Sequence, residues 1–280
     1  MQVKIAKSSG FCRGVKHAVD TAMSIPAENT YILGELIHNP IVTEQVAARG
    51  IRTVETVVEV PSGATLLLRS HGVGKAIYEE CGRRGIRVVD CTCAFVKRIQ
   101  KIVEELSGTD REIVITGSAR HPEVIGLNGW CGGRAVVIDS PDSPEIAALS
   151  DKNVAVVSQT TFSEEKFDKI IKNIEKVCKK TVEIFKTICY TTKERQREAA
   201  SLSEECDAMI VLGGANSSNT QKLYEICTAH CANVIRLARA DDFRPDKIKN
   251  FKNVGIVSGA STPLAQTQEV LFKMDNNTEV

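Results

Sequence analysis

The stretch NVAVVSQTTFSEEKFDKIIKNIEKV, residues 153–177, contains one complete strand–loop–helix unit. The apolar run at 153–157 ends in small polar residues, as expected for a strand buried on both faces. Apolar residues then recur at a spacing near 3.6 over 164–177, which predicts an amphipathic helix. Ser163 precedes this helix with Lys166, not Glu, three residues later, so we expect a simple serine N-cap rather than a capping box.

The same unit recurs along the chain. Nine apolar runs each lead into a loop rich in glycine, serine and other small polar residues. In order, these loops are KSSGFCRG, GELIHNP, RSHGVG, CTCAF, TGSARHPEV, SQTTFS, CYTTKERQ, GGANSSNT and SGASTP. Strands that alternate with helices predict parallel sheets with right-handed crossovers, so we expect an α/β fold.

The nine units group in threes, and a cysteine-bearing loop opens each third, at Cys12, Cys93 and Cys189. We therefore expect three pseudo-threefold related α/β modules, each a small, mainly parallel sheet with flanking helices. Ligands bind beyond the carboxyl ends of parallel strands, so modules that face one another would turn their loops towards one central cavity. The predicted modules are 1–92, 93–188 and 189–280.

Composition excludes several classes of protein. The chain has 280 residues, with 36 Lys and Arg against 35 Asp and Glu, a net charge of +1. Proteins that bind a nucleic-acid backbone usually have a large basic excess, so we expect no nucleic-acid partner. No apolar run approaches the roughly 20 residues that span a bilayer. The N-terminus also lacks the apolar stretch of a secretory signal, so we expect a cytoplasmic protein without membrane contact.

Ten cysteines in a reducing compartment are expected to be buried apolar side chains, reactive thiols or metal ligands rather than disulfides. Cys12, Cys93 and Cys189 differ from the others because each opens a third of the chain just beyond a predicted strand. Three thiolates suit an iron–sulfur cluster with one iron that has no protein ligand, and such an iron is both a Lewis acid and an electron conduit. Zinc held by Cys and His is the alternative, and spacing alone does not decide between the two metals.

Other polar side chains also follow predicted strands. His38, His71 and His121 each lie just beyond a strand end, and Glu123 follows His121 by two residues. A carboxyl group in a closed cavity can have a raised pKa and serve as a proton donor. The loops at 216–219 and 261–262 enter helices, where Ser and Asn can be N-caps or can hold a phosphate group. The chain has no P-loop and no GxGxxG motif, so a phosphate site would consist of His, Ser and Asn side chains.

These loops resemble the motifs of the 4-hydroxy-3-methylbut-2-enyl diphosphate reductase family, also called IspH or LytB. GFCRGVKHAV, GELIHNP, RSHGV, GSARHPEV, SQTTFS, ICYTTKERQ, GGANSSNT and SGASTP occur in the family's order along the whole chain. Two positions depart from the family pattern: Ala94 stands where a proline is usual, and Arg13 where an apolar residue is usual. Cys91 is a second thiol beside Cys93 and could replace it as a ligand.

The resemblance implies a [4Fe-4S] cluster on Cys12, Cys93 and Cys189, and a diphosphate site. It implies that Glu123 delivers protons, that Thr160 helps to hold the substrate hydroxyl, and that His121 acts with them. Glu35, three residues before His38, is the rival proton donor. The substrate-binding residues carried over to this chain are His38, His71, His121, Thr160, Ser217, Ser218, Asn219 and Ser261.

The activity implied by the resemblance is the last step of the non-mevalonate isoprenoid pathway. An allylic alcohol diphosphate would be reduced by two electrons to isopentenyl or dimethylallyl diphosphate, with loss of water. Its hydroxyl would bind the open iron, and electrons would come from ferredoxin or flavodoxin, because the chain has no flavin or nicotinamide motif. Two alternatives stay open: another three-cysteine [4Fe-4S] enzyme of quinolinate-synthase-like type, and a non-enzymatic zinc- or redox-sensing protein.

Overall fold

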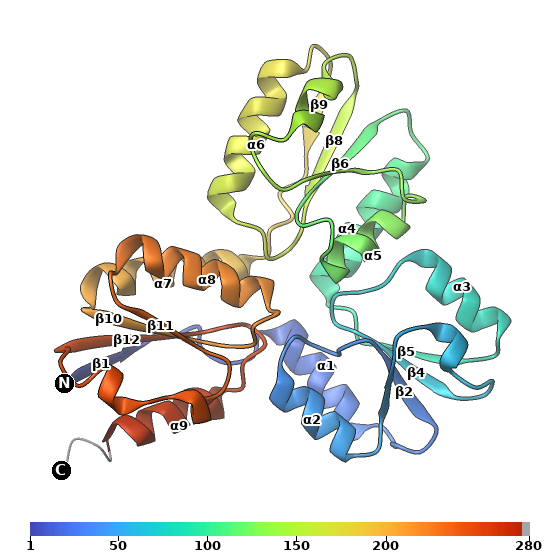
Figure 1. Cartoon of the computed structure of the whole chain (residues 1–280). Helices are drawn as coiled ribbons and strands as arrows, with labels where there is room; N and C mark the ends of the chain where they lie inside the picture. The colour runs from blue at the N-terminus through green and yellow to red at the C-terminus, as the bar shows by residue number, and fades with distance from the viewer. Residues whose placement is uncertain (276–280) are drawn as a thin grey trace. The chain divides into compact units, whose positions relative to one another are not determined.

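The computed structural model describes residues 1–275, and the last five residues of the predicted third module, 276–280, lie outside this part. The described chain contains three separate four-stranded sheets, and every strand pairing in them is parallel (Figure 1). The predicted α/β class, with three small parallel sheets and flanking helices, is confirmed. The chain divides into two compact units: unit I comprises Met1–Lys16, Ile37–Gln45 and Tyr190–Val280, and unit II comprises His17–Leu36 and Val46–Cys189.

The three sheets have one strand order. The first sheet, in unit II, has the order β3-β2-β4-β5, with β2 (Thr30–Leu33), β3 (Arg52–Val54), β4 (Thr65–Leu68) and β5 (Arg87–Asp90). The second sheet, also in unit II, has the order β7-β6-β8-β9, with β6 (Glu112–Thr116), β7 (Val136–Ile138), β8 (Val154–Ser158) and β9 (Val182–Ile184). The third sheet, in unit I, has the order β11-β10-β12-β1, with β10 (Ala208–Leu212), β11 (Val234–Leu237), β12 (Asn253–Ser258) and β1 (Gln2–Ile5).

The N-terminal strand belongs to the third sheet. In a parallel pairing, Gln2 of β1 lies opposite Asn253 of β12, and Ile5 lies opposite Ile256. The sheets therefore do not follow the predicted boundaries 1–92, 93–188 and 189–280, because the first strand of the chain completes the last repeat. A cysteine loop follows the fourth strand of each sheet, so each cysteine ends a repeat rather than opening one.

Three strands, β3, β7 and β11, are absent from the nine predicted units. Each is the second strand of its repeat and lies at one edge of its sheet. Edge strands are short and only partly covered, so their apolar pattern is weak. Each is followed by 3-10 turns and not by a loop that carries candidate site residues. These turns are η1 (Val57–Glu59), η2 (Pro144–Leu149), and η3 (Ala240–Asp242) with η4 (Pro245–Lys247).

Residues 1–275 contain nine α-helices. They are α1 (Arg13–Ser24), α2 (Pro40–Ala48), α3 (Lys75–Arg83), α4 (Ala94–Ser107), α5 (Pro122–Gly129), α6 (Glu164–Val177), α7 (Tyr190–Glu205), α8 (Ser218–His230) and α9 (Leu264–Asp275). The predicted cap of α6 is confirmed, because the Ser163 hydroxyl accepts the Lys166 backbone N–H at 3.3 Å. Within this part of the chain, no helix combines the length and the apolar character that a membrane crossing requires.

The second sheet packs against helices on both faces. Val114 of β6 lies in a core cluster with α6 and η2, whereas its neighbours Ile113 and Ile115 lie in a cluster with α4 and α5. Side chains alternate between the two faces of a strand, so a run of apolar residues fills both clusters. Helix α4 starts directly after Cys93 at the end of the first sheet and yet packs on the second. Cys93 therefore lies where the chain leaves one sheet for the next.

The third sheet repeats this arrangement. Ile210 and Leu212 of β10 lie in a cluster with α9 and η3, and Met209 and Val211 lie in a cluster with α7 and α8. Helix α7 starts directly after Cys189, which follows the last strand of the second sheet. Cys189 thus occupies the same crossover position as Cys93.

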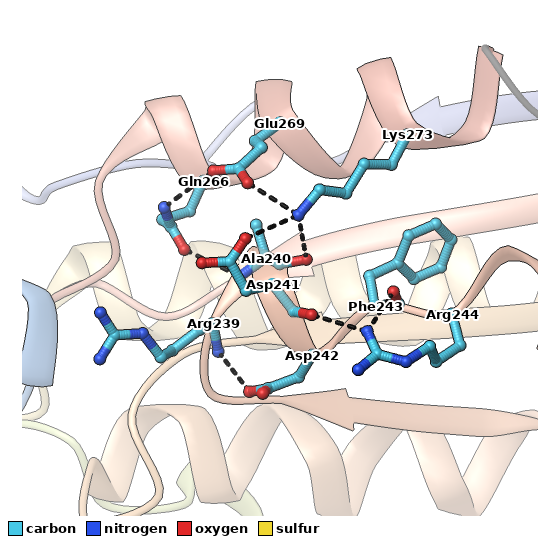
Figure 2. Close-up of polar contacts among 9 residues, drawn as sticks. All are labelled: Arg239, Ala240, Asp241, Asp242, Phe243, Arg244, Gln266, Glu269 and Lys273. Atoms are coloured by element: carbon cyan, nitrogen blue, oxygen red, sulfur yellow. Dashed lines mark hydrogen bonds and ion pairs between the residues drawn. The ribbon is translucent and has the colours of Figure 1, made fainter.

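Polar contacts attach helix α9 to the turn after β11. The Gln266 side-chain oxygen accepts the Ala240 backbone N–H at 2.9 Å, and the Lys273 ammonium lies 2.8 Å from the carboxylates of both Asp241 and Glu269 (Figure 2). Exposed ion pairs contribute little individually. Here they share one lysine, which also donates to the Ala240 carbonyl at 3.1 Å, and so they fix the orientation of α9 relative to η3.

We expect the buried β10 side chains to carry much of the stability of unit I. Ile210 is fully buried, and replacing a buried isoleucine by alanine costs about 2–5 kcal/mol through lost burial and a cavity. Ile210→Ala should therefore lower the urea midpoint measured by circular dichroism. Ile125→Ala is the matched control, because Ile125 is 55% exposed and its truncation should change stability by about 0.5 kcal/mol or less. Equal losses at both positions would contradict this core.

Candidate functional site

The three cysteines predicted as cluster ligands occupy equivalent positions in the three repeats. Each backbone N–H donates to a carbonyl oxygen in the loop after the third strand of its own sheet. The pairs are Cys12 to Ala260, Cys93 to Ser70 and Cys189 to Thr160, each at 3.0 Å. All three thiols are partly exposed and lie outside disulfides, whereas six of the seven other cysteines are buried. Accessible thiols on a fixed backbone fit the role of thiolate ligands to iron.

Cys91 and Cys93 differ in their surroundings although they are two residues apart. Cys91 is fully buried, and burial, followed by the nearby charge of Asp90, raises its pKa to about 11. Cys93 is partly exposed at the N-cap of α4, where the helix dipole favours negative charge. Because the thiolate is the form that binds a metal, these surroundings favour Cys93 over Cys91 as the ligand.

Polar side chains fasten the loops that carry Cys93 and Cys189. Asp90 accepts the Thr92 backbone N–H at 2.9 Å, and its other carboxylate oxygen lies 2.8 Å from the Lys97 ammonium. In the second sheet, the Thr187 hydroxyl accepts the Ser158 backbone N–H at 2.6 Å and donates to the Ser158 carbonyl at 2.8 Å. Each loop is therefore anchored at the carboxyl end of its sheet.

Glu123 and Thr160 form a buried acid–hydroxyl pair in unit II. Glu123, in the first turn of α5, is 1% exposed. The Thr160 backbone N–H donates to one carboxylate oxygen at 2.6 Å, and the Thr160 hydroxyl donates to the other at 2.7 Å. Burial raises the pKa of Glu123 to about 7, although both hydrogen bonds from Thr160 act to lower it. A carboxyl group with this pKa can give and take a proton near neutral pH. Glu35, by contrast, is exposed.

His71 and His121 lie together, although they follow strands of different sheets. Their rings meet edge to face with centroids 5.5 Å apart. His121 caps α5, and its Nδ1 accepts the Glu123 backbone N–H at 3.1 Å, so in the neutral ring Nε2 carries the proton. Glycine permits this approach of the two loops, since a Cβ on Gly126 would lie 3.3 Å from the Gly72 carbonyl oxygen.

In unit I, the structure brings together the loops of His38, Ser217 and Ser261. The Ser261 hydroxyl donates to the His38 carbonyl at 3.2 Å. A Cβ on Gly214 would lie 2.5 Å from the same oxygen, so only glycine allows the loop after β10 to pass there. Ser217 caps α8, with its hydroxyl accepting the Thr220 N–H at 3.3 Å, and Ser218 is the first residue of that helix.

Asn219 is buried, and the polar atoms of its side chain make no hydrogen bonds among residues 1–275. The residue is 4% exposed, and these atoms are its amide oxygen and its amide nitrogen. Leaving a buried polar group unpaired costs roughly 1–3 kcal/mol, so the amide group is suited to binding a ligand.

The sequence prediction omitted Asn39, which is 2% exposed. Its side-chain oxygen accepts the Ile41 and Val42 backbone N–H groups, at 3.0 and 3.3 Å, at the start of α2. Asn39, His121 and Ser217 therefore occupy one position in the three repeats, the start of the helix after the first strand. The signal was present in GELIHNP, where Asn precedes a proline that can begin a helix.

These features define a class of protein: an α/β enzyme with a threefold-repeated parallel sheet, one accessible thiol per repeat and a buried acid–hydroxyl pair. The chain belongs to the LytB protein family, whose model matches residues 3–275. This confirms the predicted resemblance and sets aside the quinolinate-synthase-like and non-enzymatic alternatives.

The chain is similar to curated proteins over nearly its whole length. It is 40% identical to the 4-hydroxy-3-methylbut-2-enyl diphosphate reductase of Caldanaerobacter subterraneus subsp. tengcongensis, covering 98% of this chain and 96% of the relative. It is 38% identical to the enzyme of that name from Clostridioides difficile, covering 99% and 100%.

Solved structures agree. The E-1-hydroxy-2-methyl-but-2-enyl-4-diphosphate reductase of Plasmodium falciparum superposes with a TM-score of 0.89 at 25% identity, over 97% of this chain and 87% of that chain. A second structure, described as the terminal enzyme of the non-mevalonate pathway, has a TM-score of 0.70 at 33% identity, over 99% and 100%.

We expect Glu123→Gln to remove a pH-dependent loss of stability. The pKa of Glu123 is about 7 in the folded protein, against an ordinary value of 4.5, so the folded state favours the protonated acid. The resulting stabilisation is complete below the unfolded pKa and is lost as pH rises through the folded pKa. Relative to Glu123→Gln, the wild type should therefore lose about 3 kcal/mol of unfolding free energy between about pH 5 and pH 8. Urea unfolding at several pH values measures this, and a flat difference would show that Glu123 titrates normally.

Proposed function

We propose that this chain reduces 4-hydroxy-3-methylbut-2-enyl diphosphate to isopentenyl diphosphate and dimethylallyl diphosphate, with loss of water, in the last step of the non-mevalonate isoprenoid pathway. The observation that carries the proposal is the buried pair of Glu123 and Thr160. The Thr160 hydroxyl lies 2.7 Å from a carboxyl group whose pKa is about 7. The Thr160 carbonyl also accepts the Cys189 backbone N–H. Family membership and the names of the relatives support the choice of substrate.

We propose that Cys12, Cys93 and Cys189 hold a [4Fe-4S] cluster. The residues fit this group, because all three are partly exposed thiols with the same backbone hydrogen bond, and each begins a crossover between sheets. When bound, the cluster would supply electrons and one Lewis-acidic iron that has no protein ligand.

The task of Glu123 and Thr160 is to move protons. Replacing the allylic hydroxyl by hydrogen consumes two electrons and two protons, one proton for the departing water and one for the allylic carbon. A carboxyl group with a pKa near 7 is half protonated at neutral pH, so Glu123 can supply the proton that turns the hydroxyl into water. Thr160 holds the substrate hydroxyl and relays the proton to it: the Thr160 hydroxyl gives its own proton to the substrate and takes one from Glu123 along their hydrogen bond.

The diphosphate is bound by neutral donors and by histidines that can be protonated. His121 and Ser217 are the N-caps of helices α5 and α8, and helix N-termini attract phosphate groups. The buried amide of Asn219 supplies a donor that has no partner among the described residues. The proposed diphosphate-binding residues are His38, His71, His121, Ser217, Ser218, Asn219 and Ser261.

We also propose an electron donor and a cellular compartment for this reductase. The chain carries no nicotinamide or flavin motif, so the electrons come from ferredoxin or flavodoxin. None of the ten cysteines, all among the described residues, is in a disulfide, which suits the reducing cytoplasm.

The cysteine pair allows a direct test of the cluster ligands. Cys93→Ser should sharply lower the iron and sulfide content of anaerobically purified protein, because its thiolate is a ligand, and Cys12→Ser and Cys189→Ser should do the same. Cys91→Ser is the matched control and should retain the content of the wild type. The reverse outcome for Cys91 and Cys93 would show that the buried thiol is the ligand.

Turnover of the allylic diphosphate with reduced methyl viologen, measured anaerobically, tests the activity. Glu123→Gln keeps the shape of the side chain but removes its titrating proton, so turnover should fall at least about 10²-fold. Its cluster absorbance should be unchanged. Glu35→Gln is the control and should turn over normally. Loss of activity in Glu35→Gln alone would move the proton donor to the first repeat.

A further inference from the structure

Two charged side chains of α7 contact the loop that precedes Cys12, all within unit I. Arg195 is 4% exposed, and its guanidinium donates to the Gly10 carbonyl at 2.7 Å and to the Ser258 carbonyl at 2.8 Å. One turn later, the Glu198 carboxylate accepts the Lys7 and Ser8 backbone N–H groups and the Ser8 hydroxyl. Since α7 begins directly after Cys189, the helix of one cysteine holds the loop of another.

Arg195 holds both chain segments that flank the Cys12 hydrogen bond. Gly10 lies two residues before Cys12, and Ser258 lies two residues before Ala260, whose carbonyl accepts the Cys12 backbone N–H at 3.0 Å. The Gly10 N–H also donates to the Ser258 hydroxyl at 3.0 Å. One guanidinium therefore fixes the donor and the acceptor side of this contact together.

The repeat shows that this position needs no charge for folding. Arg195 is the sixth residue after Cys189. The sixth residues after Cys12 and Cys93 are Ala18 and Ile99, which are apolar and almost fully buried. Burying a guanidinium is costly unless its hydrogen bonds are made. A buried arginine in place of a small or aliphatic side chain therefore indicates a specific task, and its contacts place that task at the loop of Cys12.

We propose that Arg195, supported by Glu198, is a positioning residue that holds the Cys12 loop ready to bind the cluster. The inference rests on the proposed cluster site. The loops of the other two cysteines are held by side chains of their own sheets, Asp90 for Cys93 and Thr187 for Cys189. Releasing Arg195 therefore leaves the Cys12 thiolate on a loose loop, while the other two ligands keep their places.

The first experiment uses cluster-free protein, so it does not depend on the proposed activity. Hydrogen exchange measured by mass spectrometry should be at least tenfold faster in the peptide covering residues 6–12 of Arg195→Met. Exchange in the peptide covering 208–212, the central strand of the same sheet, should not change. Arg197→Gln is the matched control, since Arg197 is an exposed arginine of the same helix, and it should exchange like the wild type. Unchanged exchange at 6–12 in folded Arg195→Met would overturn the proposal.

The second experiment follows the reconstituted cluster. Release of iron to a chelator should be at least tenfold faster in Arg195→Met than in the wild type, and the electron paramagnetic resonance spectrum of the reduced cluster should broaden. Arg195→Lys keeps the charge and can make one of the two hydrogen bonds. It should therefore release iron more slowly than Arg195→Met. If Arg195→Met does not fold, hydrogen exchange and iron release are both measured on Arg195→Lys and Glu198→Gln instead. A rate of iron release within twofold of the wild-type rate in these variants would overturn the proposal.

The two experiments separate this inference from the proposed function. A wild type that binds no cluster would overturn the proposed function and, with it, the role of Arg195. A wild type with a normal cluster, beside variants with unchanged exchange and iron release, would overturn the role of Arg195 alone.

Discussion

One backbone hydrogen bond, repeated three times, underlies the rest of this structure. In each repeat, the N–H of a cysteine after the fourth strand donates to a carbonyl after the third strand, at 3.0 Å. The bond lies at the carboxyl edge of a parallel sheet, where side chains from separate strands come together. It also lies where the chain leaves its sheet, so the same contact sets the position of the thiol and the start of the next helix. Side chains differ between repeats, but this backbone geometry does not, which explains how three unlike loops present three similar thiols.

Around this framework, burial gives different chemistry to similar groups. Cys91 and Cys93 are neighbours, yet burial raises the pKa of Cys91 to about 11, whereas Cys93 sits at the N-terminus of a helix. Glu123 is buried beside a threonine, and its pKa is about 7, whereas Glu35 is exposed. The sheet edge brings the candidates together, and solvent access then decides which of them can act as a ligand or as an acid.

The sequence predicted those parts of the fold and site that depend on strong local patterns. The α/β class and helix α6 with its Ser163 cap followed from apolar spacing and a single capping residue. The edge strands β3, β7 and β11 did not, because partly exposed strands of three or four residues carry little pattern. The pairing of β1 with β12 joins residues at opposite ends of the chain, and no local pattern encodes it. Arg195 was missed because only its burial and its contacts with distant residues distinguish it from an ordinary surface arginine. Asn39 was missed although its position before Pro40 marks a helix start.

The pairing of β1 with β12 also has a consequence for biosynthesis. Residues 2–5 are synthesised long before their partners at 253–256. The first and second sheets consist of contiguous stretches and can form while synthesis continues, whereas the third sheet cannot be completed until β12 has been made. During that time, β1 and the adjoining loop with Cys12 remain an unpaired strand and a free thiol on the nascent chain. Unpaired strands invite aggregation, so this segment is where a chaperone would protect the growing chain.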